Sequence, residues 1–384
     1  MNITLLTPIQ ASNEWFVYVN SIFERKIREL GHDVDQILFE NIDFDLVKQI
    51  ESRNSDFYIS QSGIGSDIRI FLDRGGEKNF WEHSKRKVCL LHFDHPFQCL
   101  SNHSLDASNC LHVFSCKTYF DAANLFVKKK KSPKILLPNP LLVDEEKLSL
   151  NTGDSFSIIK NYFVDKIILE KRKTDKVLNF HCNEIVSLVN EYLIKNDYFN
   201  HHDFLLSYFS DNDFGVSIGN ATVVEFFKWF QSEVSLIKLG IILKETQQFK
   251  VNIFGVGLSD KFEETKKRNF FSGLSSDKSQ ELYYSNFGII DFSPCEGLHD
   301  RSQRSLFNER PFLSGTDPKE MNFYKNYSEF FFNFSPNNLL KKCEMITCNP
   351  NYLKEKVIQF KKDYTREFSW ENYLNVIIKN LNLL

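Results

Sequence analysis

The sequence predicts an α/β protein with two Rossmann-like domains. Short apolar runs alternate with helically spaced segments over residues 2–140 and again over 249–315. The apolar runs are nearly continuous, which is typical of parallel strands that helices cover on both faces. With 384 residues, the chain is also longer than one hydrophobic core usually supports. We therefore expect two parallel sheets, each with its own core.

The first domain is predicted over residues 1–145. After the apolar run NITLLTP, apolar side chains recur at helical spacing from Trp15 to Leu30, and Gly31 stands where a helix end favours glycine. Further strands are predicted at residues 32–39, 56–60, 87–93, 111–115 and 134–140, and further helices at 43–52 and 117–126. This order is that of a parallel α/β sheet.

The pattern changes after residue 145. Residues 146–245 contain long helical segments at 177–195 and 220–245, so a helical bridge is expected there. A second Rossmann-like domain is expected over 246–350. Its strands are predicted at residues 249–257, 287–294 and 310–315, and its helices at 277–287, 300–309 and 337–346. Two more helices, 350–368 and 369–384, close the chain, the last with Ser369 as its N-cap.

Charge and composition argue against several classes of protein. The chain has 47 basic and 50 acidic residues, which gives no general attraction to nucleic acid or to an anionic membrane. No apolar run has the roughly 18 residues of a membrane span, and the eight cysteines form no CxxC pair. We expect a cytoplasmic protein with reduced thiols. The run Lys128 to Lys131 is expected to be a solvated loop, with a peripheral membrane contact or an acidic acceptor as the alternative.

In an open parallel sheet, ligands bind beyond the carboxyl ends of the strands. The loop SQSGIGSD follows one predicted strand, and Gly63 and Gly65 allow close backbone approach there. The loop HFDHPFQ follows another and carries Asp94 and His95. Asp94 could hold the His95 imidazole as a general base, or it could cap the turn that Pro96 enforces. Both interpretations stay open.

Four potential metal ligands also lie near this second loop: His92, His95, Cys99 and His103. Their spacing matches no zinc pattern, because several ligands would have to come from one irregular segment. We expect polar or capping roles for them and no bound metal.

A third loop, GLHDRSQRSLF, follows the strand that ends near Ser293. Asp300 is expected at the N-cap of the next helix, whose free amide groups and partial positive charge favour an anion. Arg301 and Arg304 lie three residues apart, hence on one helix face, and could clamp a diphosphate. The alternative is an ion-pair face with the acidic side chains of Glu296, Glu309 or Asp317.

These motifs resemble those of the CgeB-like (spore-maturation-protein) glycosyltransferases. That family has a strand ending in G-x-G, a helix ending in YxxS, an apolar strand and then G-x-H-D-R with a helix. Here these read VNIFGVG, ELYYSNFGIIDFSP and GLHDRSQRSLF, and HFDHPF is similar to the family's Asp-His-Pro loop. The resemblance implies the GT-B plan of two Rossmann-like domains facing a cleft, with residues 351–384 returning to the first, acceptor-side domain.

The resemblance also implies an activity. It is the metal-independent transfer of a sugar from a nucleotide-diphosphate sugar to a glycan, a lipid-linked glycan or a protein, in cell-surface glycan biosynthesis, with no further cofactor. Matched by position, the residues on the donor side are Gly297, His299, Asp300 and Arg301, with Gly255 and Gly257 near the donor phosphates. Arg304 follows Glu296 by eight positions, where related transferases have a second Glu after seven intervening residues. A nucleotide-sugar-binding protein without catalysis and a GT-B-like epimerase remain alternatives.

Overall fold

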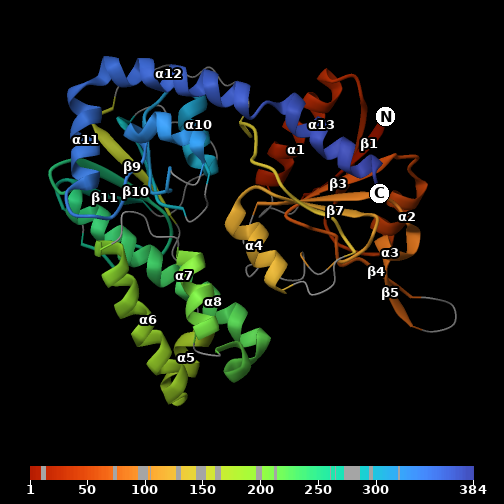
Figure 1. The fold of residues 1–384 in the computed structure, drawn as a ribbon, viewed down its shortest axis with the longest axis horizontal. Helices are drawn as coiled ribbons and strands as arrows, with labels where there is room; N and C mark the ends of the chain where they lie inside the picture. Colours follow the sequence, from red (N-terminus) through yellow and green to blue (C-terminus); the bar gives the residue numbers. More distant parts are fainter. Residues whose placement is uncertain are drawn as a thin grey trace. The chain divides into compact units, whose positions relative to one another are not determined.

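The chain forms two compact units, each with its own parallel sheet (Figure 1). The computed structural model describes residues 1–9, 14–71, 76–93, 103, 105–126, 131–143, 153–160, 166–195, 201–211, 214–259, 261–263, 265–271, 286–293, 297–318 and 321–384. Unit 1 comprises Met1–Asp144 with Tyr364–Leu384, and unit 2 comprises Glu145–Asp363. The prediction of two Rossmann-like sheets is confirmed.

Unit 1 contains a six-stranded parallel sheet in the order β2-β1-β3-β6-β7-β8. These strands are β1 (Asn2–Pro8), β2 (Asp33–Phe39), β3 (Phe57–Gln61), β6 (Val88–His92), β7 (Cys110–Phe114) and β8 (Lys134–Leu136). The helices between them are α1 (Glu14–Glu29), α2 (Phe44–Ser52), α3 (Phe80–Ser84) and α4 (Lys117–Phe126), and an antiparallel hairpin joins β4 (Arg69–Phe71) to β5 (Glu77–Asn79). The strand order reverses between β1 and β3, which is the switch point of this sheet.

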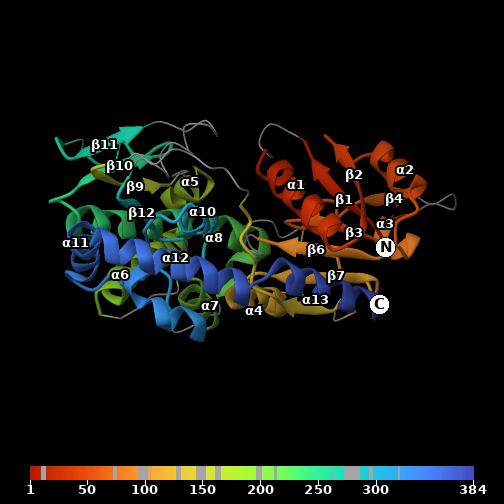
Figure 2. The ribbon, with the colours of Figure 1, turned by 90° about the horizontal axis from the view of Figure 1, so that it is seen from above.

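Both faces of this sheet are buried, as the continuous apolar strands require. Ile3 and Leu5 of β1 belong to one apolar cluster, and Leu6 belongs to another on the opposite face. The first cluster includes the buried side of α13 (Trp370–Asn382), which lies beside α1 (Figures 1 and 2). The Ser369 hydroxyl accepts the backbone N–H of Asn372, so the predicted N-cap is confirmed.

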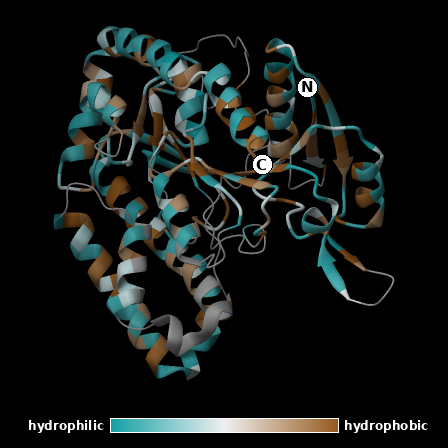
Figure 3. Ribbon diagram, turned by 45° about the vertical axis from the view of Figure 1, so that its right-hand side comes forward, coloured by the Kyte–Doolittle hydropathy of each residue, from teal (hydrophilic) through white to brown (hydrophobic). Residues whose placement is uncertain are grey.

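Unit 2 contains a five-stranded parallel sheet in the order β11-β10-β9-β12-β13. The strands are β9 (Ser155–Ile159), β10 (Lys250–Phe254), β11 (Arg268–Phe271), β12 (Gly288–Asp291) and β13 (Phe312–Ser314). In chain order this is 3-2-1-4-5, the Rossmann order, and the switch point lies between β9 and β12. In Figure 3 the strands of both sheets are largely brown, whereas the helices alternate between teal and brown.

Unit 2 also contains eight described helices. They are α5 (Lys166–Thr174), α6 (Lys176–Lys195), α7 (His201–Asp211), α8 (Phe214–Glu245), α10 (Asp300–Phe307), the 3₁₀ helix η3 (Asn322–Phe330), α11 (Asn338–Cys348) and α12 (Pro350–Glu367). Helices α5 to α8 pack against one another and lie together in Figure 1. Among the described residues, no helix combines the length and the apolar character needed to cross a membrane.

The predicted helical bridge over residues 146–245 is wrong in one respect. This segment also contains β9, which lies in the middle of the second sheet and pairs with β10 and β12. Unit 2 therefore starts at Glu145 rather than at residue 246, and its helices belong to the same compact unit. The return to unit 1 likewise starts at Tyr364, within α12, and not at residue 351. The expected helix over 277–287 falls largely outside the described residues.

Candidate functional site

The carboxyl edge of the second sheet gathers most of the predicted donor-side residues. Strand β12, next to the switch point, ends at Asp291. Helix α10 follows this strand and begins at Asp300. Gly255 and Gly257 follow the end of β10, on the other side of β9. Gly257 has φ +79°, a left-handed conformation that favours glycine. The sequence therefore brings two separate motifs to one edge of the sheet.

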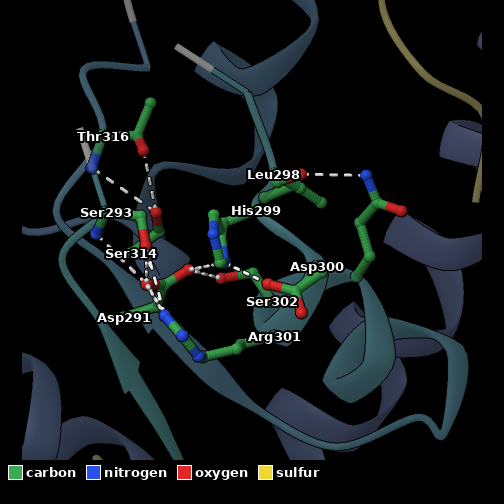
Figure 4. A network of polar contacts seen from close by, with 10 residues as sticks. Asp291, Ser293, Leu298, His299, Asp300, Arg301, Ser302, Ser314 and Thr316 are labelled. Atoms are coloured by element: carbon green, nitrogen blue, oxygen red, sulfur yellow. Dashed lines mark hydrogen bonds and ion pairs between the residues drawn. The ribbon is translucent and has the colours of Figure 1, made fainter. Parts of the chain in front are cut away.

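Asp291 is the centre of a buried polar network at this edge (Figure 4). One carboxylate oxygen accepts from the Ser293 backbone N–H at 3.1 Å and from the Ser293 hydroxyl at 2.7 Å. The other oxygen accepts from the Ser302 hydroxyl of α10 at 3.0 Å. Burial alone would raise the pKa of Asp291, but His299, Arg301 and the Ser293 hydroxyl outweigh it, and the pKa is lowered. The side chain is thus an ionised carboxylate inside the protein.

His299, and not Asp300, is the N-cap of α10, which corrects the sequence-based expectation. No side chain caps the helix, because the Asp300 carboxylate pairs instead with Nδ1 of His299. The same ring nitrogen lies 3.8 Å from Oδ2 of Asp291. Burial would raise the pKa of Asp300, but His299 and, after it, Arg301 and Arg304 hold the pKa well below its usual range. Two carboxylates therefore face one side of the imidazole.

Arg301 completes this network from the first turn of α10. Its Nη1 lies 3.9 Å from Oδ1 of Asp291 and 3.5 Å from the Ser293 hydroxyl, and about a fifth of its side chain is exposed (22%). The ion-pair alternative named Glu309 as a partner, but Glu309 pairs with Lys361 at 3.2 Å. Arg301 does lie near a carboxylate, that of Asp291, to which the sequence motifs gave no role.

Two further features complete the described part of this edge. The Leu298 carbonyl accepts from the Gln303 side chain at 2.9 Å, which ties the turn before α10 to the helix (Figure 4). A Cβ added at Gly297 would meet only the Tyr324 hydroxyl, at 3.9 Å, so local space alone does not require glycine there. Lys160 follows β9 at the switch point, and its Nζ lies 5.8 Å from the centre of the Phe292 ring.

Sequence reasoning missed both Asp291 and Lys160. Asp291 was assigned to an apolar strand, although an acidic residue at the carboxyl end of such a strand is itself a signal. Lys160 was missed because β9 was missed.

In unit 1, Gly63 and Gly65 lie in the turn after β3, at the switch point of the first sheet. Donors from other elements hold the carbonyl groups of this turn. The Ser60 hydroxyl donates to the Ile64 carbonyl at 2.5 Å, and the Trp81 indole N–H donates to the Gly65 carbonyl at 2.8 Å. The turn is thus built into the unit, and its proposed acceptor role stays a prediction.

The expected base pair, Asp94 and His95, lies outside the described residues. Next to that loop, the buried rings of His92 and His103 stack with centroids 4.0 Å apart. His112 Nε2 donates to the Leu105 carbonyl at 2.8 Å, so its Nδ1 accepts from His92 Nε2 at 2.9 Å. Stacked neutral rings do not converge on a point, and the described residues contain no group of three or more side chains suited to a metal ion.

Comparison with known proteins gives structural matches alone. No protein-family model matches the sequence, and no curated protein is significantly similar to it. A mutant O-GlcNAc transferase from Thermobaculum terrenum aligns with 99% of this chain and 67% of its own, with a TM-score of 0.51 and 8% sequence identity. This likeness shows the fold alone, which is a GT-B fold with two Rossmann-like domains.

Two other solved structures align at lower TM-scores. TarM from S. aureus, in complex with UDP and other ligands, covers 96% of this chain at a TM-score of 0.42 and 10% identity, and this chain spans 59% of TarM. MurG from Acinetobacter baumannii covers 97% of this chain, and 99% of MurG aligns, at a TM-score of 0.34 and 7% identity.

Proposed function

We propose that this chain is a glycosyltransferase that moves a sugar from a nucleotide-diphosphate sugar to a glycan, a lipid-linked glycan or a protein. One observation carries the proposal: His299 and Arg301 lie at the start of α10, and Arg304 lies in its last turn, beside the switch point of the second sheet. The GT-B fold is consistent with this activity but does not by itself define it.

The proposed chemistry is electrostatic. As the glycosidic bond breaks, negative charge grows on the leaving diphosphate, and fixed donors stabilise the transition state more than the ground state. The backbone N–H groups of the first turn of α10 have no acceptor within the helix, and the helix dipole adds a partial positive charge. Arg301 and Arg304 add two full charges on one face of α10, and no metal ion is required in this scheme.

The acceptor side of the proposal rests on unit 1. Asp94 and His95 are the proposed source of the base that deprotonates an acceptor hydroxyl, with the turn of Gly63 and Gly65 as the acceptor-side loop. The resemblance of HFDHPF to the Asp-His-Pro loop of CgeB-like transferases supports the assignment of the base. A cytoplasmic site of action at the inner face of a membrane would suit a lipid-linked acceptor. A cell-surface glycan is the corresponding proposed product.

A thermal-shift panel tests the donor side directly. The panel contains the diphosphates of adenosine, guanosine, uridine, cytidine and thymidine, their common sugar conjugates, and the matching monophosphates as controls. A ligand at a hundred times its dissociation constant stabilises the folded protein by about 2.7 kcal/mol. We expect one diphosphate family to raise the melting temperature and its monophosphate to do so less. If no nucleotide raises it, the proposal is wrong.

Product analysis separates the alternative functions. A transferase releases the nucleoside diphosphate faster when an acceptor is present. An epimerase converts the nucleotide sugar in the absence of any acceptor, and a protein that only binds leaves the sugar unchanged in every mixture.

A further inference from the structure

We propose that Asp291 is the positioning residue of the diphosphate site: it fixes the loop at Ser293, the first turn of α10 and the orientation of His299 and Arg301. The inference rests on the proposed function and assigns a role to a residue to which the sequence motifs gave none. It does not require Asp291 to touch the ligand.

Asp291 is buried at the end of β12. Only 2% of its side chain is exposed, and an ionised carboxylate at such a depth is unfavourable unless hydrogen bonds and opposite charges compensate. A structural polar residue at the end of β12 would need only a neutral hydrogen-bonding side chain. The ionised form of Asp291 is favoured because His299 and Arg301 face it and the Ser293 hydroxyl donates to it. The negative charge of Asp291 therefore matches the Arg301 guanidinium and the His299 imidazole rather than the packing of the sheet.

The hydrogen-bond partners of Asp291 come from two different elements. The Ser293 backbone and hydroxyl belong to the loop after β12, whereas the Ser302 hydroxyl belongs to α10. One carboxylate thus joins the end of the strand, the loop and the start of the helix (Figure 4). The helix N-terminus, with its amide groups, is held at a fixed distance from the strand end. Removing the charge of Asp291 would make the position of the helix N-terminus less well fixed, without removing any residue that is proposed to contact the ligand.

Asp291 also acts on the imidazole of His299. Its Nδ1 faces Asp300 directly and Asp291 at 3.8 Å, so Nδ1 carries a proton. Among the described residues no hydrogen bond engages Nε2, the ring nitrogen on the other side. The two carboxylates therefore set both the ring orientation and the tautomer, and Nε2 is the atom that His299 offers to a ligand.

The test compares Asp291→Asn with Asn286→Ala. Asn286 is equally buried and lies just before β12, at the opposite end of the same strand, where it bonds Ser155 and Ser157. Both variants disturb a buried polar network of the same sheet, but only the first lies at the carboxyl edge. Ser302→Ala is a milder variant that removes one donor to Asp291 and keeps the charge.

Calorimetric titration with the diphosphate selected by the panel gives the binding result. We expect Asp291→Asn to weaken binding by about 10- to 100-fold and Ser302→Ala to weaken it by a smaller factor. Asn286→Ala should leave the affinity unchanged, even where it lowers the melting temperature as much as Asp291→Asn does. In turnover assays kcat should fall more than KM rises. Unchanged binding in Asp291→Asn, or the same loss in Asn286→Ala, overturns the inference.

An NMR measurement separates failure of this inference from failure of the proposed function. Long-range ¹⁵N–¹H spectra of the histidine rings report the tautomer, and the His299→Gln variant identifies the His299 signals. We expect Nδ1–H in the wild type and a changed signature in Asp291→Asn, with or without nucleotide. If the wild type binds no nucleotide, the proposed function fails while this signature still decides the role of Asp291. If the His299 signals are the same in Asp291→Asn as in the wild type, the proposed role of Asp291 is wrong.

Discussion

The Phe23 ring of α1 and the Trp370 indole at the start of α13 lie edge to face, with centroids 4.8 Å apart. The Trp370 N–H donates to the Leu141 carbonyl at 3.2 Å, and the Tyr364 hydroxyl donates to the Asn139 carbonyl at 2.9 Å. The C-terminal segment thus stabilises unit 1, since the apolar side chains of α13 form part of that unit's hydrophobic core. A chain cut before α12 ends would expose that core.

Ile377→Ala should therefore destabilise unit 1. Ile377 is fully buried in α13, and removing most of such a side chain costs about 2–5 kcal/mol. Hydrogen exchange during mild denaturation measures each unit separately, and the loss of protection should fall on unit 1. Leu383→Ala is the control, because Leu383 is 78% exposed and should change stability by less than about 0.5 kcal/mol. Loss of protection in unit 2 alone would contradict this assignment.

Gly288→Ala should destabilise unit 2. A Cβ at Gly288 would lie 2.6 Å from the Pro311 carbonyl oxygen, a backbone atom that cannot move aside cheaply, so we expect a cost of about 1–3 kcal/mol or more. Gly240→Ala is the matched control. Gly240 lies within α8, its added Cβ would come no closer than 3.8 Å to Phe262, and alanine should stabilise the helix by about 0.4–1 kcal/mol. Thermal melts that shift in the same direction for both variants would refute the steric argument.

The sequence predicted both sheets but missed the central strand of the second. In β9, Phe156 and Ile158 are apolar, while Ser155 and Ser157 face the opposite side. Asn286 and Asn252 satisfy these two hydroxyl groups inside the protein. A polar face next to an apolar one normally indicates a strand that is exposed on one side. Only the tertiary structure shows that Asn252 of β10 and Asn286, just before β12, make that face a buried one.

The candidate site was predicted only in part, and the missed part again depended on contacts between residues that are distant in the sequence. The positions of Arg301 and the start of α10 followed from local pattern, because a turn and a helix start are short-range features. Asp291 lies eight or more residues from His299, Arg301 and Ser302, so its role toward them depended on the path of the intervening loop. The exchange of the N-cap from Asp300 to His299 has a different cause: an ion pair between these two neighbouring residues replaced the capping bond.

Stability should fall steeply below pH 6.5. Burial, followed by neighbouring charges, lowers the pKa of His92, lowers that of His103 to about 3 and, together with Lys134, lowers that of His112 to about 4. Because the unfolded chain protonates these rings near their ordinary value of 6.5, it binds more protons than the folded protein as pH falls below that value. The stabilisation is complete above pH 6.5 and is lost down to about pH 3–4, by about 1.4 kcal/mol per histidine per pH unit.

Denaturant unfolding at pH 4.5 to 8 measures this slope. His103→Leu should make it shallower by about 1.4 kcal/mol per pH unit, since one titrating ring is removed. His83→Gln is the control, because His83 is exposed in α3 and should leave the slope as it is. Equal slopes in the wild type and in His103→Leu would show that this ring does not titrate on unfolding.

Arg301→Ala should lower turnover by about 10- to 1000-fold, from the loss of a charge-assisted contact that strengthens as the diphosphate leaves. Arg301→Lys keeps the charge but not the planar fork of donors, so its loss should be intermediate. Lys267→Ala controls for net charge, because Lys267 precedes β11 at the amino edge of the same sheet and donates to the Gln248 carbonyl. Initial rates with the donor selected by the panel give kcat and KM for each variant.

A double variant tests whether Arg301 and Asp291 act together. If Arg301→Ala and Asp291→Asn lower turnover equally, and the double variant lowers it no further, the two residues act as one unit. Wild-type turnover in Arg301→Ala would instead show that the start of α10 is not part of the donor site.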